Sequence, residues 1–216
     1  MKKIVVTGAT SMIGVATIEE CLRNNIEVIA ITRRNSKNMY RLPSNKNLQV
    51  IEKNLDELAS YTPENISADV FYHFGWAKTS HEGRMDIAAQ ELNIRHTLDA
   101  VQLAKKFNCK KFIFAGSQAE YGLSDKPLNR ETSIKPITPY GVSKYAAGKL
   151  AEILCNDLNI NFVEVRILSI FGTNDSPSTL INYIIDCYKK KFKRFWLRLN
   201  KFGIIFMLTM RHVLSD

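Results

Sequence analysis

The chain has 216 residues, of which 45% are hydrophobic, so it is long and apolar enough to bury the core of one domain. No apolar run approaches the roughly 18 residues of a membrane span, and Met1-Lys2-Lys3 leads directly into a strand-like segment without a signal peptide. The four cysteines form no C-x-x-C pair, which suits reduced thiols. We therefore expect a cytoplasmic protein with no membrane partner.

The net charge of +9 is concentrated at one end of the chain. Residues 189–216 hold eight lysines and arginines and a single acid, which leaves a net charge of +2 for the rest. The folded part therefore carries no charge signal for nucleic acid, and we predict no nucleic-acid partner.

The first predicted element is a short buried strand, Ile4–Val6, followed by a glycine turn and a helix that extends to about Asn24. Gly8 permits a tight turn, and Gly14 lets the helix pack close to the strand. Ser11 stands where the middle glycine of a dinucleotide fingerprint is expected, and its hydroxyl can donate to a phosphate instead. The alternative is an ordinary strand-to-helix turn.

The second predicted strand, Ile26–Ile31, leads into Thr32-Arg33-Arg34. A dinucleotide site usually has an acid here for the ribose of NAD. This segment has none, and Arg33 can pair with a 2′-phosphate, so the sequence favours NADP over NAD. Two solvated loop arginines are the alternative.

Further strands and helices alternate along the chain and predict an α/β fold, a doubly wound parallel sheet of the Rossmann-like type. The remaining predicted strands are Leu48–Glu52, Asp69–Phe74, Lys111–Ala115 and Asn161–Leu168. The predicted helices are 84–107, 139–159 and one that begins at Pro177 after a Ser176 cap.

Three residues follow or end strands at the predicted carboxyl edge, where ligands bind in such sheets. His73 has no partner at metal-ligand spacing, so we expect a hydrogen-bonded strand-end histidine and no metal site. Gly75 allows a close approach of backbone to a ligand, and Ser117 can hydrogen-bond a substrate oxygen. A turn serine is the alternative for Ser117.

Tyr140 and Lys144 stand four residues apart and share one face of the predicted helix. An ammonium group nearby stabilises the phenolate, so we expect a lowered pKa that makes Tyr140 an acid/base near neutral pH. Taken alone, such a pair also occurs by chance on surface helices.

These motifs together resemble the extended short-chain dehydrogenase/reductases, specifically the NAD(P)-dependent epimerase/dehydratase family that acts on nucleotide sugars. The resemblance covers about Lys2–Tyr188 and includes Arg166 leading to Phe171-Gly172. It implies that Tyr140 moves the proton of a sugar hydroxyl or ketone, that Lys144 lowers its pKa and holds the nicotinamide ribose, and that Ser117 orients the reacting oxygen.

The resemblance also implies a set of residues that line the cofactor: Met12, Ile13, Leu55, Phe74, Gly75, Asn93 and Leu168, together with Gly8, Ser11, Gly14, Arg33, Tyr140 and Lys144. Asn54 stands where the family often has an aspartate that contacts adenine, which puts that contact in doubt. Gln118 and Ala119 replace the Asp-Glu pair of the family's dehydratases, so dehydration is disfavoured. A reductase or an epimerase remains, and Arg33 favours the reductase.

The character of the chain changes at Lys189, so we divide it into a dinucleotide-binding domain, 1–188, and an aberrant tail, 189–216. A membrane-surface segment, a nucleic-acid arm and a final helix are three interpretations of this tail. We favour a fourth: regrouped codons of Leu199–Ser215 can encode a segment around Val-Asp-Asp-Ala that resembles the family at this point. The tail is then an out-of-frame product, and most of the sugar-binding lobe is missing.

Two functional hypotheses follow. The first is an NAD(P)-dependent reductase or epimerase of a nucleotide sugar, weakened or inactivated by the missing lobe. The second is a non-catalytic dinucleotide-binding domain that senses cofactor or regulates a partner. The resemblance further implies a homodimer through helices, including the helix that carries Tyr140.

Overall fold

The computed structural model describes residues 1–129, 131–176 and 179–189. The chain forms two compact units, Met1–Asp175 and Ser176–Asp216, and each is described by itself. All the proposed site residues belong to the first unit.

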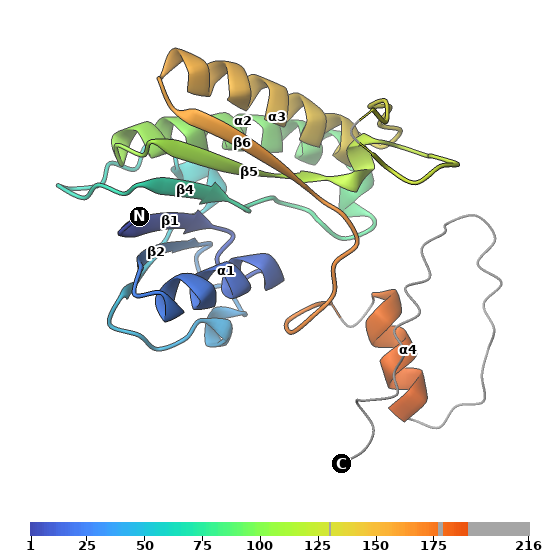
Figure 1. The fold of residues 1–216 in the computed structure, drawn as a ribbon, viewed down its shortest axis with the longest axis horizontal. Coiled ribbons are helices and arrows are strands. Elements are labelled where there is room, and N and C mark those ends of the chain that lie inside the picture. The colour runs from blue at the N-terminus through green and yellow to red at the C-terminus, as the bar shows by residue number, and fades with distance from the viewer. Residues whose placement is uncertain (130, 177–178, 190–216) are drawn as a thin grey trace. The chain divides into compact units, whose positions relative to one another are not determined.

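The first unit is built on a six-stranded parallel sheet in the order β3-β2-β1-β4-β5-β6 (Figure 1). The strands are β1 Lys3–Thr7, β2 Glu27–Thr32, β3 Leu48–Glu52, β4 Val70–His73, β5 Lys111–Ser117 and β6 Asn161–Ile167. The chain passes outward from β1 to β3, then returns to β4 on the other side of β1. The order therefore reverses between β1 and β4, which is where open parallel sheets bind their ligands.

Three long helices cover the sheet, α1 on one face and α2 with α3 side by side on the other (Figure 1). They are α1 Met12–Arg23, α2 Ile87–Lys106 and α3 Pro139–Asp157. This arrangement confirms the predicted doubly wound fold. Helices on both faces explain why the inner strands are continuously apolar, since both sides of each strand are buried.

Local sequence signals fix where these helices begin and end. Ser11, Asp86 and Thr138 are the N-caps, and each side chain accepts a hydrogen bond from the backbone N–H three residues later, at 3.1 Å. Asparagines follow the three helices in the left-handed conformation, each at φ 56°: Asn25, Asn108 and Asn159. Asparagine tolerates this conformation better than most residues, so it ends a helix cleanly.

Two apolar clusters, one on each face, form the core. The cluster beneath α2 and α3 contains Phe71, Phe107, Phe112 and Phe114, all fully buried. Phe71 and Phe112 stack across β4 and β5 with their ring centroids 5.4 Å apart. The cluster beneath α1 uses aliphatic side chains of β1 and β2 with Ile18. The aromatic layer thus lies under the helices that carry the candidate site.

The sheet ends at β6 in the part of the chain that the structure describes. Val163 and Val165 on this strand are 38% and 46% exposed. On the α1 side, a groove of about 790 Å³ is partly lined by Tyr72 of β4 and by Phe171. No helix among the described residues is long and apolar enough to cross a membrane.

The second unit contributes one described helix, α4 Leu180–Lys189. The helix predicted to begin at Pro177 thus begins at Leu180 among the described residues, and Pro177 itself lies outside them. The tail beyond Lys189 also lies outside the described residues, so its frame and the domain boundary placed there remain predictions.

Candidate functional site

The turn after β1 has the geometry that a phosphate group needs. Gly8 adopts φ +65°, in the left-handed region, and a Cβ on Gly14 would lie 2.4 Å from the Gly8 carbonyl oxygen. The Ser11 hydroxyl oxygen accepts the Gly14 N–H at 3.1 Å, which leaves its own proton free to donate from an exposed side chain. The first turn of α1 therefore presents N–H groups, a hydroxyl and the positive end of the helix dipole.

The backbone that follows β4 packs against this turn. A Cβ on Gly8 would lie 2.7 Å from the Phe74 carbonyl carbon, so only a glycine fits there. Thr7 ties the two segments together, because its hydroxyl accepts the Gly75 N–H at 3.2 Å and bonds Nδ1 of His73 at 2.8 Å. Burial, together with the positive charge of Lys144, lowers the pKa of His73 to about 3, so this histidine is a neutral structural group.

The other predicted cofactor-lining residues lie at the same edge of the sheet, but their side chains differ in exposure. Met12, Ile13, Leu55 and Phe74 are half-buried, and Leu168 is 47% exposed. Their contacts with a cofactor remain predictions. The donors, glycines and apolar groups present fit a dinucleotide laid across β1 and β4.

Asn93 on α2 uses its amide on the protein itself. Its oxygen accepts the Ala77 N–H at 2.8 Å, and its nitrogen donates to the carbonyls of Ala77 at 3.1 Å and Ala89 at 3.0 Å. The side chain is 1% exposed. Asn93 therefore holds the loop after β4 in place, while the direct cofactor contact implied by the resemblance remains a prediction.

The loop after β2 separates its two arginines. Arg34 pairs with Glu57 through two hydrogen bonds, and its backbone N–H donates to the Asn54 side chain at 3.2 Å. Asn54 is thus occupied by this loop, in line with the doubt about its adenine contact. Arg33 is exposed and has no hydrogen bond or ion pair among the described residues.

Ser117 and Tyr140 come together although they belong to different elements. Ser117 ends β5 and accepts the Ala119 N–H at 3.2 Å, while Tyr140 is the second residue of α3. A Cβ on Gly141 would lie 2.4 Å from the Ala119 carbonyl oxygen, so glycine allows α3 to approach this turn. The Ser117 side chain therefore lies close enough to Tyr140 to lower the pKa of its phenol, while their shared catalytic role remains a prediction.

Lys144 lies one turn further along α3 and is almost inaccessible, at 4% exposure. Its ammonium group donates to the Ala115 carbonyl at 2.8 Å and lies 3.8 Å from the centroid of the Trp76 ring. Its distance to the centroid of the Tyr140 ring is 6.0 Å. Burial lowers the pKa of Lys144 to about 7, against partial compensation by Glu120 and Glu164.

The expected lowering of the Tyr140 pKa by Lys144 is wrong for this structure. Burial raises the pKa of Tyr140, and the nearby Ser117 side chain and Arg84 guanidinium oppose this only in part. Arg84 lies closer than Lys144, with its guanidinium carbon 4.8 Å from the Tyr140 ring centroid. The helical spacing was right, but burial outweighs the charge because Lys144 is itself desolvated and directed at Ala115.

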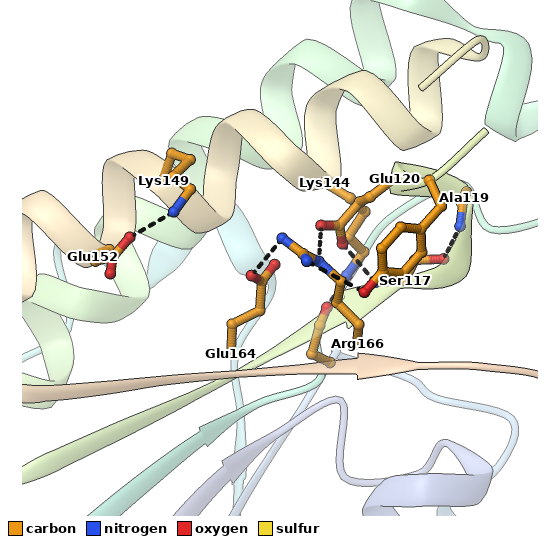
Figure 2. Close-up of polar contacts among 10 residues, drawn as sticks. Ser117, Ala119, Glu120, Lys144, Lys149, Glu152, Glu164 and Arg166 are labelled. Atoms are coloured by element: carbon orange, nitrogen blue, oxygen red, sulfur yellow. Dashed lines mark hydrogen bonds and ion pairs between the residues drawn. The ribbon is translucent and has the colours of Figure 1, made fainter. Parts of the chain in front are cut away.

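Sequence reasoning missed the charged cluster beneath Ser117. Glu120 is fully buried and paired with Arg166, which also contacts Glu164 (Figure 2). One signal was visible, because Ser117-x-x-Glu120 is a capping-box pattern. The pairing with Arg166 was not, because it joins residues 46 positions apart through the β5–β6 register.

Comparisons with known proteins identify the family of the chain. The NAD dependent epimerase/dehydratase family matches residues 4–199. The chain is 24% identical over 191 residues to a putative UDP-glucose 4-epimerase of Methanocaldococcus jannaschii, a match that covers 85% of this chain and 62% of that protein. It is also 24% identical over 188 residues to a CDP-abequose synthase of Salmonella typhimurium, which covers 87% of this chain and 60% of that protein.

Solved structures show the same fold. A UDP-N-acetylglucosamine 4-epimerase from Methanobrevibacter ruminantium, in complex with UDP-N-acetylmuramic acid, superposes with a TM-score of 0.76 at 23% identity, over 88% of this chain and 63% of that one. A UDP-glucuronic acid 4-epimerase from Bacillus cereus, in complex with NAD, gives 0.74 at 22% identity with the same coverage. The chain thus spans slightly more than three fifths of these structures. The family match over most of its length shows that the chain belongs to the NAD dependent epimerase/dehydratase family, among the extended short-chain dehydrogenase/reductases.

Proposed function

We propose that this chain is an NAD(P)-dependent reductase or epimerase of a nucleotide sugar, with Ser117, Tyr140 and Lys144 as its catalytic residues. The observation that carries the proposal is the convergence of Ser117 and Tyr140 beside buried Lys144, whose ammonium group lies 6.0 Å from the centroid of the Tyr140 ring. These groups follow β5 at the carboxyl edge that also carries the Gly8–Gly14 turn. Acid/base groups and a dinucleotide turn thus share one edge of the sheet.

The chemistry needs a proton carrier next to the reacting carbon. When bound, a nicotinamide cofactor accepts or supplies the hydride. Tyr140 removes or returns the proton of the sugar oxygen, and Ser117 holds that oxygen by hydrogen bonding. The raised pKa of Tyr140 keeps the phenol protonated in the free chain. A protonated phenol is better suited to donating a proton to a ketone than to removing one from a hydroxyl.

Two residues after Ser117 argue against dehydration. Elimination of water needs an acid and a base near the sugar, whereas Gln118 and Ala119 carry no carboxyl group. The Gln118 side-chain oxygen instead accepts a hydrogen bond from Ser169 at 3.2 Å. The favoured reactions therefore remain reduction and epimerisation.

The nature of the sugar carrier follows from the relatives. The proteins named above are described as acting on UDP- or CDP-sugars or were solved with UDP-linked ligands. We therefore propose a nucleotide diphosphate sugar as substrate. For the cofactor, exposed Arg33 without a carboxylate beside it supports NADP, whereas the family is named for NAD and a solved relative holds NAD.

A second function has an observation in its favour. Burial raises the pKa of Tyr140, which works against its use as a base, while the dinucleotide turn after β1 does not involve this residue. A non-catalytic domain that binds dinucleotide and regulates a partner needs this turn but not Tyr140. The two functions therefore differ in their dependence on the phenol hydroxyl.

Replacing Tyr140 by Phe separates them. An enzyme loses turnover of a panel of UDP- and CDP-sugars, measured by nicotinamide absorbance or product analysis, and retains cofactor binding measured by the unfolding midpoint. Tyr145→Phe on the same helix is the matched control and keeps its turnover. Absence of turnover in the unmodified chain, with cofactor binding retained in all variants, contradicts the enzyme and supports the sensor.

A further inference from the structure

Glu120 is a fully buried carboxylate whose two oxygens both have partners. One oxygen accepts the backbone N–H of Ser117 at 2.6 Å, and the other accepts Nε of Arg166 at 2.7 Å (Figure 2). The Ser117 hydroxyl in turn accepts the Ala119 N–H. Both the backbone and the side chain of Ser117 are therefore fixed by the short turn that contains Glu120.

Arg166 holds Glu120 in this orientation with a forked set of contacts. Its Nη2 pairs with Glu164 at 3.0 Å, and its Nη1 donates to the Tyr121 hydroxyl at 3.4 Å. The guanidinium carbon lies 5.2 Å from the centroid of the Tyr121 ring. A planar cation with several fixed donors can hold two carboxylates at once, which a lysine cannot do in the same geometry.

The second carboxylate of the cluster is only partly satisfied. Oε1 of Glu164 is buried without a hydrogen-bond partner among the described residues. A Cβ on Gly116 or Gly148 would lie 2.8 or 2.9 Å from it. Burial first, and then the nearby charge of Glu120, raise the pKa of Glu164 to about 7. The cluster thus brings two carboxyl groups together, and both lose hydration by being buried.

Such a cluster needs a reason other than stability, because well-packed apolar residues often serve as well as a buried ion pair or better. We propose that Glu120 is a positioning residue: oriented by Arg166, its carboxylate fixes Ser117 next to Tyr140 and supplies negative charge that helps keep buried Lys144 protonated. The inference rests on the proposed function, in which Ser117 and Lys144 act at the reacting centre.

The charges around Lys144 support the second part of this role. The Lys144 ammonium donates to the Ala115 carbonyl at 2.8 Å, and a Cβ on the next residue, Gly116, would lie 2.8 Å from Oε1 of both Glu120 and Glu164. Both carboxylates therefore lie near Lys144 and favour its charged form, while Arg84 opposes it and neutral His73 lies on β4 nearby. Loss of the Glu120 charge should therefore make Lys144 release its proton at lower pH. A capping residue that served the fold alone would leave the Lys144 titration unchanged.

The test is an NMR measurement on the full chain that needs no turnover. We expect the Ser117 amide proton at unusually low field, because a short hydrogen bond to a carboxylate deshields it. Glu120→Gln should move this resonance to higher field and lower the titration midpoint of the Lys144 Cε signal by about one pH unit. The matched control, Glu152→Gln, removes an exposed carboxylate paired with Lys149 on α3 and should change neither signal.

Two further variants separate position from charge. Glu164→Gln should lower the Lys144 midpoint and leave the Ser117 amide in place, because no hydrogen bond joins Glu164 to Ser117 among the described residues. Arg166→Lys keeps the positive charge but loses the fork, so it should move the Ser117 amide towards its position in Glu120→Gln. If Glu120→Gln fails to fold, the Arg166→Lys variant and the chemical shift of the Ser117 amide in the unmodified chain still test the positioning role of Glu120.

An ordinary Ser117 amide shift in the wild type, or a Lys144 midpoint unchanged by Glu120→Gln, overturns the inference. Turnover is measured separately: Glu120→Gln should lose at least tenfold in kcat while cofactor affinity is retained. If the unmodified chain turns over no nucleotide sugar but both NMR signals respond as described, the proposed function fails and the positioning role of Glu120 stands.

Discussion

Lys144 lies between Trp76 and Phe114, where water hardly reaches its ammonium group. Aromatic faces and the Ala115 carbonyl replace part of the lost hydration, yet the pKa still falls to about 7. A lysine that titrates near neutral pH can change charge when an anionic ligand binds. We therefore expect the protonation state of Lys144 to depend on whether the site is occupied.

The buried lysine should also cost stability in a pH-dependent manner. Its folded pKa lies below the unfolded value of about 10.5, so the unfolded chain binds more protons between pH 7 and pH 10.5 and stability rises with pH in this window. Lys144→Met should therefore raise the free energy of unfolding by on the order of 2 kcal/mol at pH 7, and by less at pH 10. Urea unfolding at both pH values measures this.

Lys149→Met is the control for this substitution, since Lys149 is exposed on the same helix and paired with Glu152. It should change the free energy of unfolding by under about 0.5 kcal/mol at either pH. A Lys144→Met variant that is destabilised to the same extent at pH 7 and pH 10 contradicts the argument, because packing alone would then govern the site.

The two arginines after β2 are expected to contribute differently to the choice between NADP and NAD. Arg33 is free to meet a 2′-phosphate, whereas Arg34 is held by Glu57. Arg33→Ala should weaken NADPH binding roughly tenfold, the value of one charged hydrogen bond, and leave NADH binding unchanged. Titration of nicotinamide fluorescence measures both affinities.

Arg34→Ala serves as the matched variant, because it removes an equal charge from the neighbouring position. It should affect NADPH and NADH alike. Equal affinity of the unmodified chain for the two cofactors, or an equal loss of both in Arg33→Ala, would show that the site does not read the 2′-phosphate.

At the scale of elements, sequence patterns predict what is local. The predicted strand Leu48–Glu52 matches β3 at both ends, and Pro139 opens α3, as expected. The helix predicted for 84–107 begins at Ile87, because residues 83–85 form a short 3-10 turn and Asp86 supplies the cap. A change of helix type within a continuous polar stretch leaves little periodic signal.

What could not be predicted depends on contacts between distant elements. The raised pKa of Tyr140 reflects its burial, and the Trp76 ring packs against it edge-on with the ring centroids 5.9 Å apart. The link from Glu120 to Arg166 depends on the register of β5 and β6. Spacing along one helix contains no information on either, so pairwise charge arguments from sequence overestimate the effect of Lys144.

The packing of α1 onto β1 gives a prediction for this element. A Cβ at Gly14 would meet three backbone atoms of Gly8 and Ala9 within 3 Å, and backbone cannot move aside as a flexible side chain can. Gly14→Ala should therefore push α1 outward, cost about 1–3 kcal/mol of stability and weaken cofactor binding. Urea unfolding and a cofactor titration measure the two effects.

Gly172→Ala is the comparison, because a Cβ there would meet no atom within 4 Å among the described residues. It should leave both quantities near their original values. Unchanged cofactor affinity in Gly14→Ala would mean that the turn after β1 does not hold the dinucleotide.

At the scale of the whole first unit, two groups of exposed apolar side chains are candidate sites of self-association. One lies on α2 and α3, where Leu92, Leu150 and Ile153 are 53%, 44% and 59% exposed. The other is the uncovered side of β6, with Val163 and Val165. Exposed apolar helices favour a closed dimer, whereas an unpaired strand edge favours open-ended aggregation.

Light scattering coupled to size exclusion distinguishes these two surfaces, because a dimer has a single mass whereas open-ended aggregation gives a spread of masses. If the helices associate, Ile153→Asp should convert a dimer into a monomer. Val165→Lys should then have the same mass as the unmodified dimer. If the strand edge dominates, Val165→Lys should reduce a concentration-dependent spread of masses that Ile153→Asp does not affect. We expect the dimer, since the helical surface offers three large apolar side chains on two packed elements, whereas each exposed β6 valine buries less area. A monomer at all concentrations in the unmodified chain would contradict both forms of association.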